Sequence, residues 1–228
     1  NSIFQIEYLQ IWNYEIGNHS LTEWINDGLM TIFFLLIGLE LEREVYIGEL
    51  STLKKAALPL IGALGGMIIP ALIYAGFNQG TTTQSGVGIP MATDIAFAIG
   101  ILSLLGNRVP NSLKIFLTAL AVIDDLGAII VIAIFYTASV SLLNLGIALG
   151  ILTFLFILNR LKVNSLIPYL IGGILMWYFM LNSGVHATIT GVLLAFVIPF
   201  GDGSKKNISY KLQHLLHQPV AFIILPLF

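Results

Sequence analysis

The chain has 228 residues, of which 57% are hydrophobic and 10% charged, and its formal net charge is -2. Soluble domains carry about 25% charged and about 45–50% apolar residues, so this composition predicts a polytopic membrane protein. The absence of cysteine excludes disulfides and thiol chemistry, and the near balance of charge provides no basic surface for nucleic acid.

Residues 1–24 differ in composition from the rest of the chain. Polar residues are scattered through them, Gly17 and Asn18 form a turn signal, and residues 4–8 alternate between apolar and polar side chains. This pattern favours an external hairpin or an interfacial segment over a membrane span. Because the sequence begins at Asn1 rather than at methionine and stops inside an apolar run, we expect it to be part of a longer protein.

Residues 25–228 predict an all-α transmembrane domain with seven spans and the start of an eighth, continuing beyond the end of the sequence. A helix needs about 20 mostly apolar residues to cross the hydrocarbon core, and fewer where it is broken. Runs of this kind lie at 25–42, 56–77, 86–106, 113–136, 142–159, 166–182, 184–200 and from about 219 onward.

The ten basic residues fall on alternate loops. Short loops rich in Lys and Arg stay in the cytoplasm. Basic residues follow the first, third, fifth and seventh spans, whereas the loops at 78–85, 137–141 and 182–185 contain none. We therefore place residues 1–24 outside the cell and the following residues on the cytoplasmic side: Arg43, Lys54, Lys55, Arg108, Lys114, Arg160, Lys162, Lys205, Lys206 and Lys211.

Asp94 stands near the middle of 86–106, a span that the sequence predicts to be broken. Gly86 and Pro90 disfavour a regular helix in its outer half. Thr93 is a suitable N-cap for a new half-helix, whose positive dipole end would then point at the membrane midplane. Irregular backbone at this depth is tolerated where it lines a cavity or is covered by protein, so the break itself suggests a site.

Asp124 and Asp125 stand at the centre of 113–136, at the depth expected for Asp94. Ionisable groups at this depth are expensive and by default mark an ion path or a proton relay. Neighbouring helix positions point about 100° apart, so the two aspartates should have different roles. A proton and a small cation would compete for such carboxylates, and this competition is the chemistry of an antiporter. The alternative is a buried structural polar cluster.

At these positions the sequence resembles the NhaA family of bacterial sodium/proton antiporters. The resemblance implies an NhaA-type fold of twelve helices with inverted-topology repeats and a discontinuous helix, incomplete in this chain, which would hold the second to eighth helices and part of the ninth. The motifs that carry it follow the family's order: Phe33–Glu40 (FFLLIGLE), Ala92–Ala98 (ATDIAFA), Ala121–Ile130 (AVIDDLGAII), Ser183–Thr188 (SGVHAT) and Ile224–Phe228 (ILPLF).

The resemblance also implies roles for single residues. Asp125 would be the principal carboxylate for sodium and protons, Asp124 its neighbour in the sodium site, and Asp94 with Thr93 the pair beside the broken helix. Asp124 would interact with a lysine on a later helix that lies outside this sequence. Residues 1–24 correspond to a hairpin that pairs two protomers, so we expect a homodimer contact there.

The family's activation by pH implies a group of sensing residues at the cytoplasmic mouth. These would be Glu40, Arg43 and Glu44 at the inner end of the first span, and His214 and His217 in the loop before the last one. Histidine titrates between about pH 5 and 8, and an acidic cluster attracts cations. The alternative is that the charged residues from Glu40 onward form a solvated helix end.

The resulting hypothesis is an electrogenic, pH-regulated secondary transporter in the bacterial inner membrane. It would exchange cytoplasmic sodium or lithium for external protons by alternating access, with membrane lipid as its surroundings, no cofactor and no enzymatic activity. Two alternatives remain. A magnesium-dependent prenyl or diphosphate-transfer enzyme would need repeated acids and basic residues within the spans, and a cation channel would favour a symmetric ring of acids.

Overall fold

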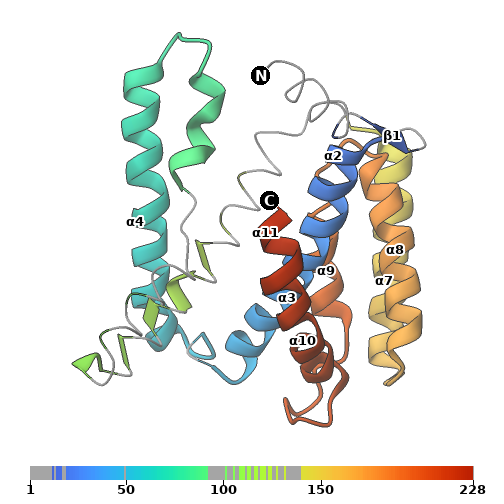
Figure 1. The fold of residues 1–228 in the computed structure, drawn as a ribbon. Helices are drawn as coiled ribbons and strands as arrows, with labels where there is room; N and C mark the ends of the chain where they lie inside the picture. Colours follow the sequence, from blue (N-terminus) through green and yellow to red (C-terminus); the bar gives the residue numbers. More distant parts are fainter. Residues whose placement is uncertain are drawn as a thin grey trace. The chain divides into compact units, whose positions relative to one another are not determined.

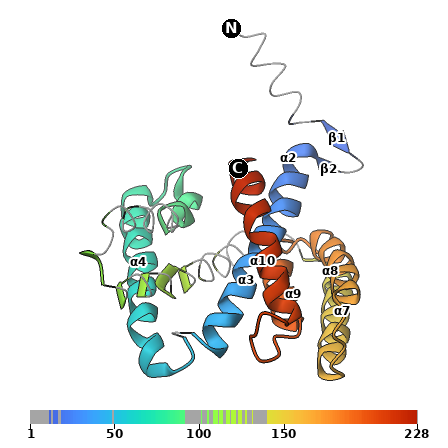
Figure 2. The same ribbon diagram turned by 60° about the horizontal axis from the view of Figure 1, so that its bottom comes forward.

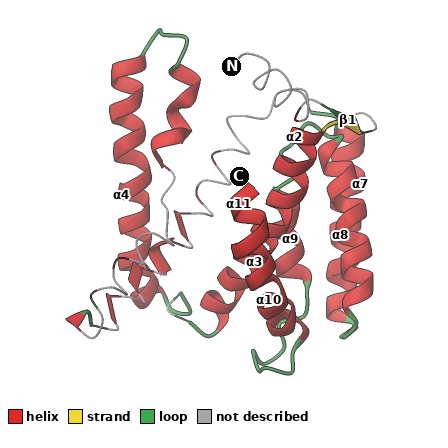
Figure 3. Cartoon of the chain, in the orientation of Figure 1, coloured by secondary structure: helices red, strands yellow, loops and turns green. Residues whose placement is uncertain are grey.

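The computed structural model describes a largely helical chain (Figures 1 and 3). The chain divides into two compact units: unit 1 comprises residues 1–39 and 138–228, and unit 2 comprises residues 40–137. The described residues are 12, 14–16, 19–48, 50–91, 101, 105, 108–110, 112, 113, 116, 117, 119–121, 123, 124, 127, 131 and 140–227.

Three helices of the described part of the chain are long and apolar enough to cross a membrane. They are Leu21–Tyr46, Leu53–Asn78 and Leu142–Arg160, and Leu166–Leu181 is a shorter apolar helix. Many of their large apolar side chains are exposed, including Leu72 and Phe77 on the second and Leu143 on the third. Exposed apolar side chains of this density suit contact with lipid, as expected for a polytopic membrane protein.

The first helical segment begins beside a short strand pair at the end of unit 1 (Figure 2). Strands β1 (Glu15–Ile16) and β2 (His19–Ser20) are antiparallel and flank residues 17 and 18, which lie outside the described residues. The helix then starts at α2 (Leu21–Glu23), four residues earlier than the predicted span, because Ser20 and Glu23 form a capping box.

The same segment continues through a π-helical turn, η1 (Trp24–Leu29), into α3 (Met30–Tyr46). Side chains satisfy the Asp27 carbonyl oxygen in this turn. It accepts hydrogen bonds from the Thr31 hydroxyl and, at 3.0 Å, from Nε1 of Trp177 on α8 (Leu166–Leu181). The wide turn is therefore fastened to a neighbouring helix of unit 1.

Helices α7 (Leu142–Arg160) and α8 (Leu166–Leu181) form an antiparallel hairpin that both ribbon views show side by side (Figures 1 and 2). The Ser141 amide donates to the Ser183 carbonyl at 2.8 Å where the hairpin's open ends meet. At the other end of α7, the side-chain Nδ2 of Asn159 donates to the Val197 carbonyl of α9 (Ile189–Val197) at 3.0 Å. The ends of α7 and α9 therefore meet.

Helix α9 packs parallel to α3 through small residues. A Cβ on Gly191 would collide with the α3 backbone around Phe34, and one on Gly38 would lie 2.7 Å from the Ala195 Cβ. Along α3, Gly38 lies C-terminal to the region around Phe34, and along α9, Ala195 lies C-terminal to Gly191. The two contacts therefore advance in the same direction along both helices, so the helices are parallel. This close approach requires glycine at both positions.

The predicted span 184–200 differs from the observed helix α9, which begins at Ile189. Turns occupy the preceding residues. Gly184 has a positive φ of 81°, and the Ser183 hydroxyl donates to the Met180 carbonyl at 2.6 Å while accepting from the Val185 amide at 3.2 Å. These local hydrogen bonds compete with the helix and delay its start.

The last helical segment also differs from its prediction. It begins at α10 (Ile208–Pro219), before the expected start near residue 219, and continues through the π-helical turn η4 (Val220–Ile224) into α11 (Leu225–Leu227). Its first part is amphipathic rather than uniformly apolar, so the hydropathy criterion missed it. Val220 and Ile224 pack with Leu36 of α3 in one buried cluster.

Unit 2 contains α4 (Leu53–Asn78) and the 3₁₀-helix η2 (Gln84–Met91). The 3₁₀ geometry over Gly86–Pro90 agrees with the predicted departure from regular α-helix in the outer half of span 86–106. Most of the half-helix expected after Thr93 lies outside the described residues, which include Ile101, in helical conformation, and Leu105, in a turn. Within the segment 112–131, the described residues from 119 onward are helical: 119–121, 123, 124, 127 and 131.

We predict that Gly191→Ala destabilises the protein by about 1–3 kcal/mol, because the added Cβ would overlap the α3 backbone rather than a flexible side chain. Thermal unfolding of the full-length protein in detergent measures this. Gly146→Ala on α7 is the matched control, since its Cβ would have no atom within 4 Å. Equal unfolding temperatures for the two variants would contradict the packing argument.

Candidate functional site

Asp124 is the predicted midplane carboxylate that the structure describes. Its side chain is 3% exposed, and its Oδ1 has no hydrogen-bond partner among the described residues. Thr93, Asp94 and Asp125 lie outside the described residues. Burying a carboxyl oxygen without a hydrogen-bond partner costs free energy, so the Asp124 carboxyl group needs a ligand or a hydrogen-bond donor at this oxygen.

The segment carrying Asp124 packs against α4 at two close approaches. A Cβ on Gly62 would lie 3.0 Å from Leu120 Cδ1, and a Cβ on Gly127 would overlap the thioether of Met67. Both contacts advance in the same direction along the two helices, so α4 and the Asp124 segment run parallel. Two parallel membrane helices require an intervening crossing, and the predicted span around Asp94 lies between them in the sequence.

A small buried cluster connects the two segments that carry the predicted aspartates. It contains Ala63 and Met67 of α4, Met91 at the end of η2, and Ile123. Met91 precedes Asp94 by three residues, and Ile123 precedes Asp124 by one. The chain before Asp94 and the chain before Asp124 are therefore packed into the same core of unit 2.

Glu40, Arg43 and Glu44 lie on the last two turns of α3 and are half-buried. Between them, Glu42 is only 2% exposed. The alternative of a solvated helix end therefore does not hold for Glu42. Its burial has no signal in the sequence, where it stands among other charged residues.

His214 and His217 lie on α10 rather than in a loop, which corrects the expected location. Both side chains are exposed, and the His214 ring stacks on the Tyr210 ring with centroids 6.3 Å apart. The histidines belong to unit 1, whereas Glu40, Arg43 and Glu44 belong to unit 2.

Unit 1 contains an apolar cavity of about 740 Å³ that the sequence did not predict. Helices α3, α8, α9 and α10 line it, with Trp24 and Trp177 in contact along its wall, their ring centroids 5.6 Å apart. The buried Thr190 hydroxyl, which also lines it, has no hydrogen-bond partner among the described residues. No Asp, Glu, Lys, Arg or His is among its described lining residues, so this cavity offers no carboxylate for a cation.

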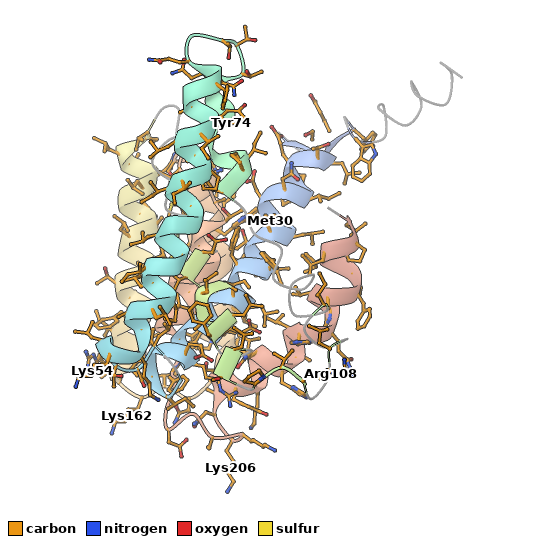
Figure 4. The ribbon with its side chains drawn as sticks, turned by 90° about the vertical axis from the view of Figure 1, so that its left-hand side faces the viewer. Met30, Lys54, Tyr74, Arg108, Lys162 and Lys206 are labelled. Atoms are coloured by element: carbon orange, nitrogen blue, oxygen red, sulfur yellow. The ribbon has the colours of Figure 1, made fainter. Side chains whose placement is uncertain are left out.

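The loop between α9 and α10 holds a carboxylate in a hydrogen-bonded turn. Asp202 accepts hydrogen bonds from the Asn207 side chain and, at 3.1 Å, from the Ser204 amide. The Asn207 and Ser204 hydrogen bonds favour the charged carboxylate and lower the pKa of Asp202 below its ordinary value. Lys205 and Lys206 extend from the same turn, and Figure 4 shows Lys206 and Lys162 at one end of unit 1.

Comparison with known proteins decides the family. The profile of a family described as Na+/H+ antiporter 1 matches residues 1–228. The chain belongs to the Na+/H+ antiporter 1 family. It is therefore an all-α, polytopic membrane protein, as its composition predicted.

Individual relatives in the Na+/H+ antiporter 1 family are similar over the whole chain. A protein of Flavobacterium johnsoniae named Na(+)/H(+) antiporter NhaA 1 is 72% identical over 228 residues, all of this chain and 60% of the relative. Similarly named proteins of Flavobacterium psychrophilum and Dechloromonas aromatica are 70% and 59% identical, over all of this chain and 59% of each relative. The chain thus spans about 60% of the length of the curated relatives it matches.

We predict that Asn207→Ala raises the pKa of Asp202 toward its ordinary value of about 3.9 and loosens the 201–207 turn. In the wild type, the stabilisation from the charged carboxylate is fully present above that ordinary pKa and is lost as pH falls through the lower folded-state pKa. Hydrogen exchange of this loop, measured at neutral pH, should be faster in Asn207→Ala. Unchanged exchange would show that these hydrogen bonds do not order the turn.

Proposed function

We propose that the full-length protein exchanges sodium or lithium ions for protons across the membrane through the carboxylates of Asp94, Asp124 and Asp125. The observation that carries this proposal is the buried Asp124 side chain, whose Oδ1 lacks a partner among the described residues. The Met67, Met91 and Ile123 cluster supports the proposal further, because it packs the chain before Asp94 against the chain before Asp124.

The chemistry follows from the cost of burying charge. A carboxylate removed from water loses its solvation, and it recovers that loss by binding a proton or a cation. Oxygen ligands suit hard cations such as sodium. When a proton and a cation compete for the same oxygens, loading one releases the other, and alternating access then couples the two movements.

The relatives described above are named Na(+)/H(+) antiporters, and these names support the proposed exchange of sodium for protons. A transporter of this type needs no enzymatic group and no cofactor, and its partners are the transported ions and the surrounding lipid. The magnesium-dependent enzyme and the cation channel receive no support from these relatives.

We propose that the basic loops face the cytoplasm of a bacterial inner membrane and that residues 1–24 face outward. Within unit 1, Lys162 and Lys206 lie at one end, and within unit 2, Lys54 lies at the end of α4 opposite Tyr74 (Figure 4). The parallel directions of α3 with α9, and of α4 with the Asp124 segment, are those required by alternating basic and non-basic loops.

We further propose pH sensing by Glu40, Arg43, Glu44, His214 and His217. The exposure of both histidine side chains on α10, within unit 1, supports this proposal. A homodimer contact through residues 1–24 is supported by the β1–β2 pair, since a strand edge can pair with its symmetry mate.

We predict that Asp125→Asn abolishes sodium-dependent proton movement by the full-length protein in proteoliposomes. The loss should exceed the ~10–100-fold reduction typical when only an outer-shell partner of a metal ligand is removed. Asp202→Asn makes the same chemical change in an exposed loop and should retain exchange. Undiminished exchange by Asp125→Asn would remove that residue from the site, and a wild type without a sodium response would refute the antiporter proposal.

Single-cysteine labelling tests the orientation, and this chain contributes no native cysteine. We predict that a membrane-impermeant maleimide labels Thr82→Cys on intact cells and Lys206→Cys only on inverted vesicles. The full-length protein must first be freed of any other cysteine. Labelling of both positions from the same side would contradict the proposed sidedness.

A further inference from the structure

The parallel contact between α4 and the Asp124 segment has an unusual feature at Gly127. The Met67 thioether occupies the volume where any other residue at position 127 would carry its Cβ. Met67 is 6% exposed, so this interdigitation is buried in the core of unit 2. The Met67 side chain of α4 thus fills a gap beside Gly127 of the Asp124 segment, and we call this gap the notch.

The notch lies one helical turn from the buried carboxylate. At about 100° per residue, positions 120, 124 and 127 form one stripe along a helix. Leu120 and Gly127, on this stripe, both contact α4, at Gly62 and Met67 respectively. Asp124 therefore lies on the face toward α4, between the two close approaches, and its depth along α4 depends on them.

The two close approaches between α4 and the Asp124 segment differ in the flexibility of the side chain at the contact. Gly62 meets the branched end of Leu120, whereas Gly127 meets an unbranched methionine with three rotatable bonds. Methionine fills an irregular gap and adapts to small shifts of its neighbour. Met67 also shares its cluster with Met91, so it touches the core that holds the chain before Asp94.

We propose that Met67 is a positioning residue for cation binding. By filling the notch at Gly127, its side chain fixes the depth of the Asp124 carboxyl along α4, and so it sets the affinity for sodium rather than the maximal rate. This inference rests on the proposed function, since it assigns Asp124 to the sodium site. It concerns the packing behind the carboxylate, and Met67 itself is not a ligand.

The test measures sodium binding and sodium-dependent proton exchange by the full-length protein, with Met67→Ala and Met67→Leu. Radioactive sodium and equilibrium dialysis report binding, and proteoliposomes report the exchange. Met67→Ala should raise the dissociation constant and the apparent KM for sodium by about tenfold, as when an outer-shell partner of a metal ligand is lost. The maximal rate should change little. Met67→Leu, which still fills the notch, should stay close to the wild type.

A second pair of variants tests the notch itself. Gly127→Ala should weaken sodium binding in the same direction, because its methyl group displaces the thioether. The double variant Met67→Ala with Gly127→Ala should bind sodium better than either single variant, since the new methyl group partly refills the space that Met67 leaves. Such non-additivity is expected only of residues in contact.

Two control variants separate positioning from general loss of packing. Met176→Ala removes a fully buried methionine from the core of unit 1, and Gly76→Ala adds a methyl group to α4 where no atom lies within 4 Å. Met176→Ala should lower the thermal stability without shifting the apparent KM for sodium, and Gly76→Ala should shift neither.

Each outcome decides one of the two proposals. An unchanged sodium affinity in Met67→Ala, or additive effects in the double variant, would overturn the positioning role. A loss of maximal rate at constant affinity would overturn it as well. A wild type that binds sodium but does not exchange it would overturn the proposed function alone, and the binding data would still decide the role of Met67.

Discussion

The packing of unit 2 is constrained by one buried carboxyl group, that of Asp124. An ion removed from water costs several kcal/mol even after the surroundings relax, and lipid offers nothing to offset that cost. Asp124 is almost entirely shielded, and one of its oxygens has no partner among the described residues. The helices packed around this group must therefore offset the cost of burying it.

Unit 2 achieves this with small residues and methionine. Gly62 and Gly127 let α4 approach the Asp124 segment closely, and Met67 and Met91 share one buried cluster with Ile123. In a membrane, close packing is a main source of helix association, because lipid is as apolar as the side chains it would replace. The same principle governs unit 1, where Gly191 and Gly38 bring α9 against α3.

Helix ends show where local chemistry overrides hydropathy. The capping box of Ser20 and Glu23 starts the first helical segment before its apolar run, and the turn at Ser183 and Gly184 delays α9 within an apolar one. The amphipathic α10 places His214 and His217 on a helix where low hydropathy had indicated a loop. Hydropathy measures the preference for lipid, whereas side-chain hydrogen bonds decide where a backbone turn begins.

The class of the protein, its family and the residues expected to bind ions could all be predicted before the fold was known. Composition, alternating basic loops and the motifs around Asp94 and Asp125 are properties of the amino-acid sequence and do not depend on how the helices pack. The burial of Asp124 and of Glu42, and the filling of the space at Gly127 by Met67, became known from the helix packing alone. Those facts depend on which helix packs against which and in what register. Such contacts join positions far apart in the chain, so neither composition nor the spacing of residues along the sequence determines them.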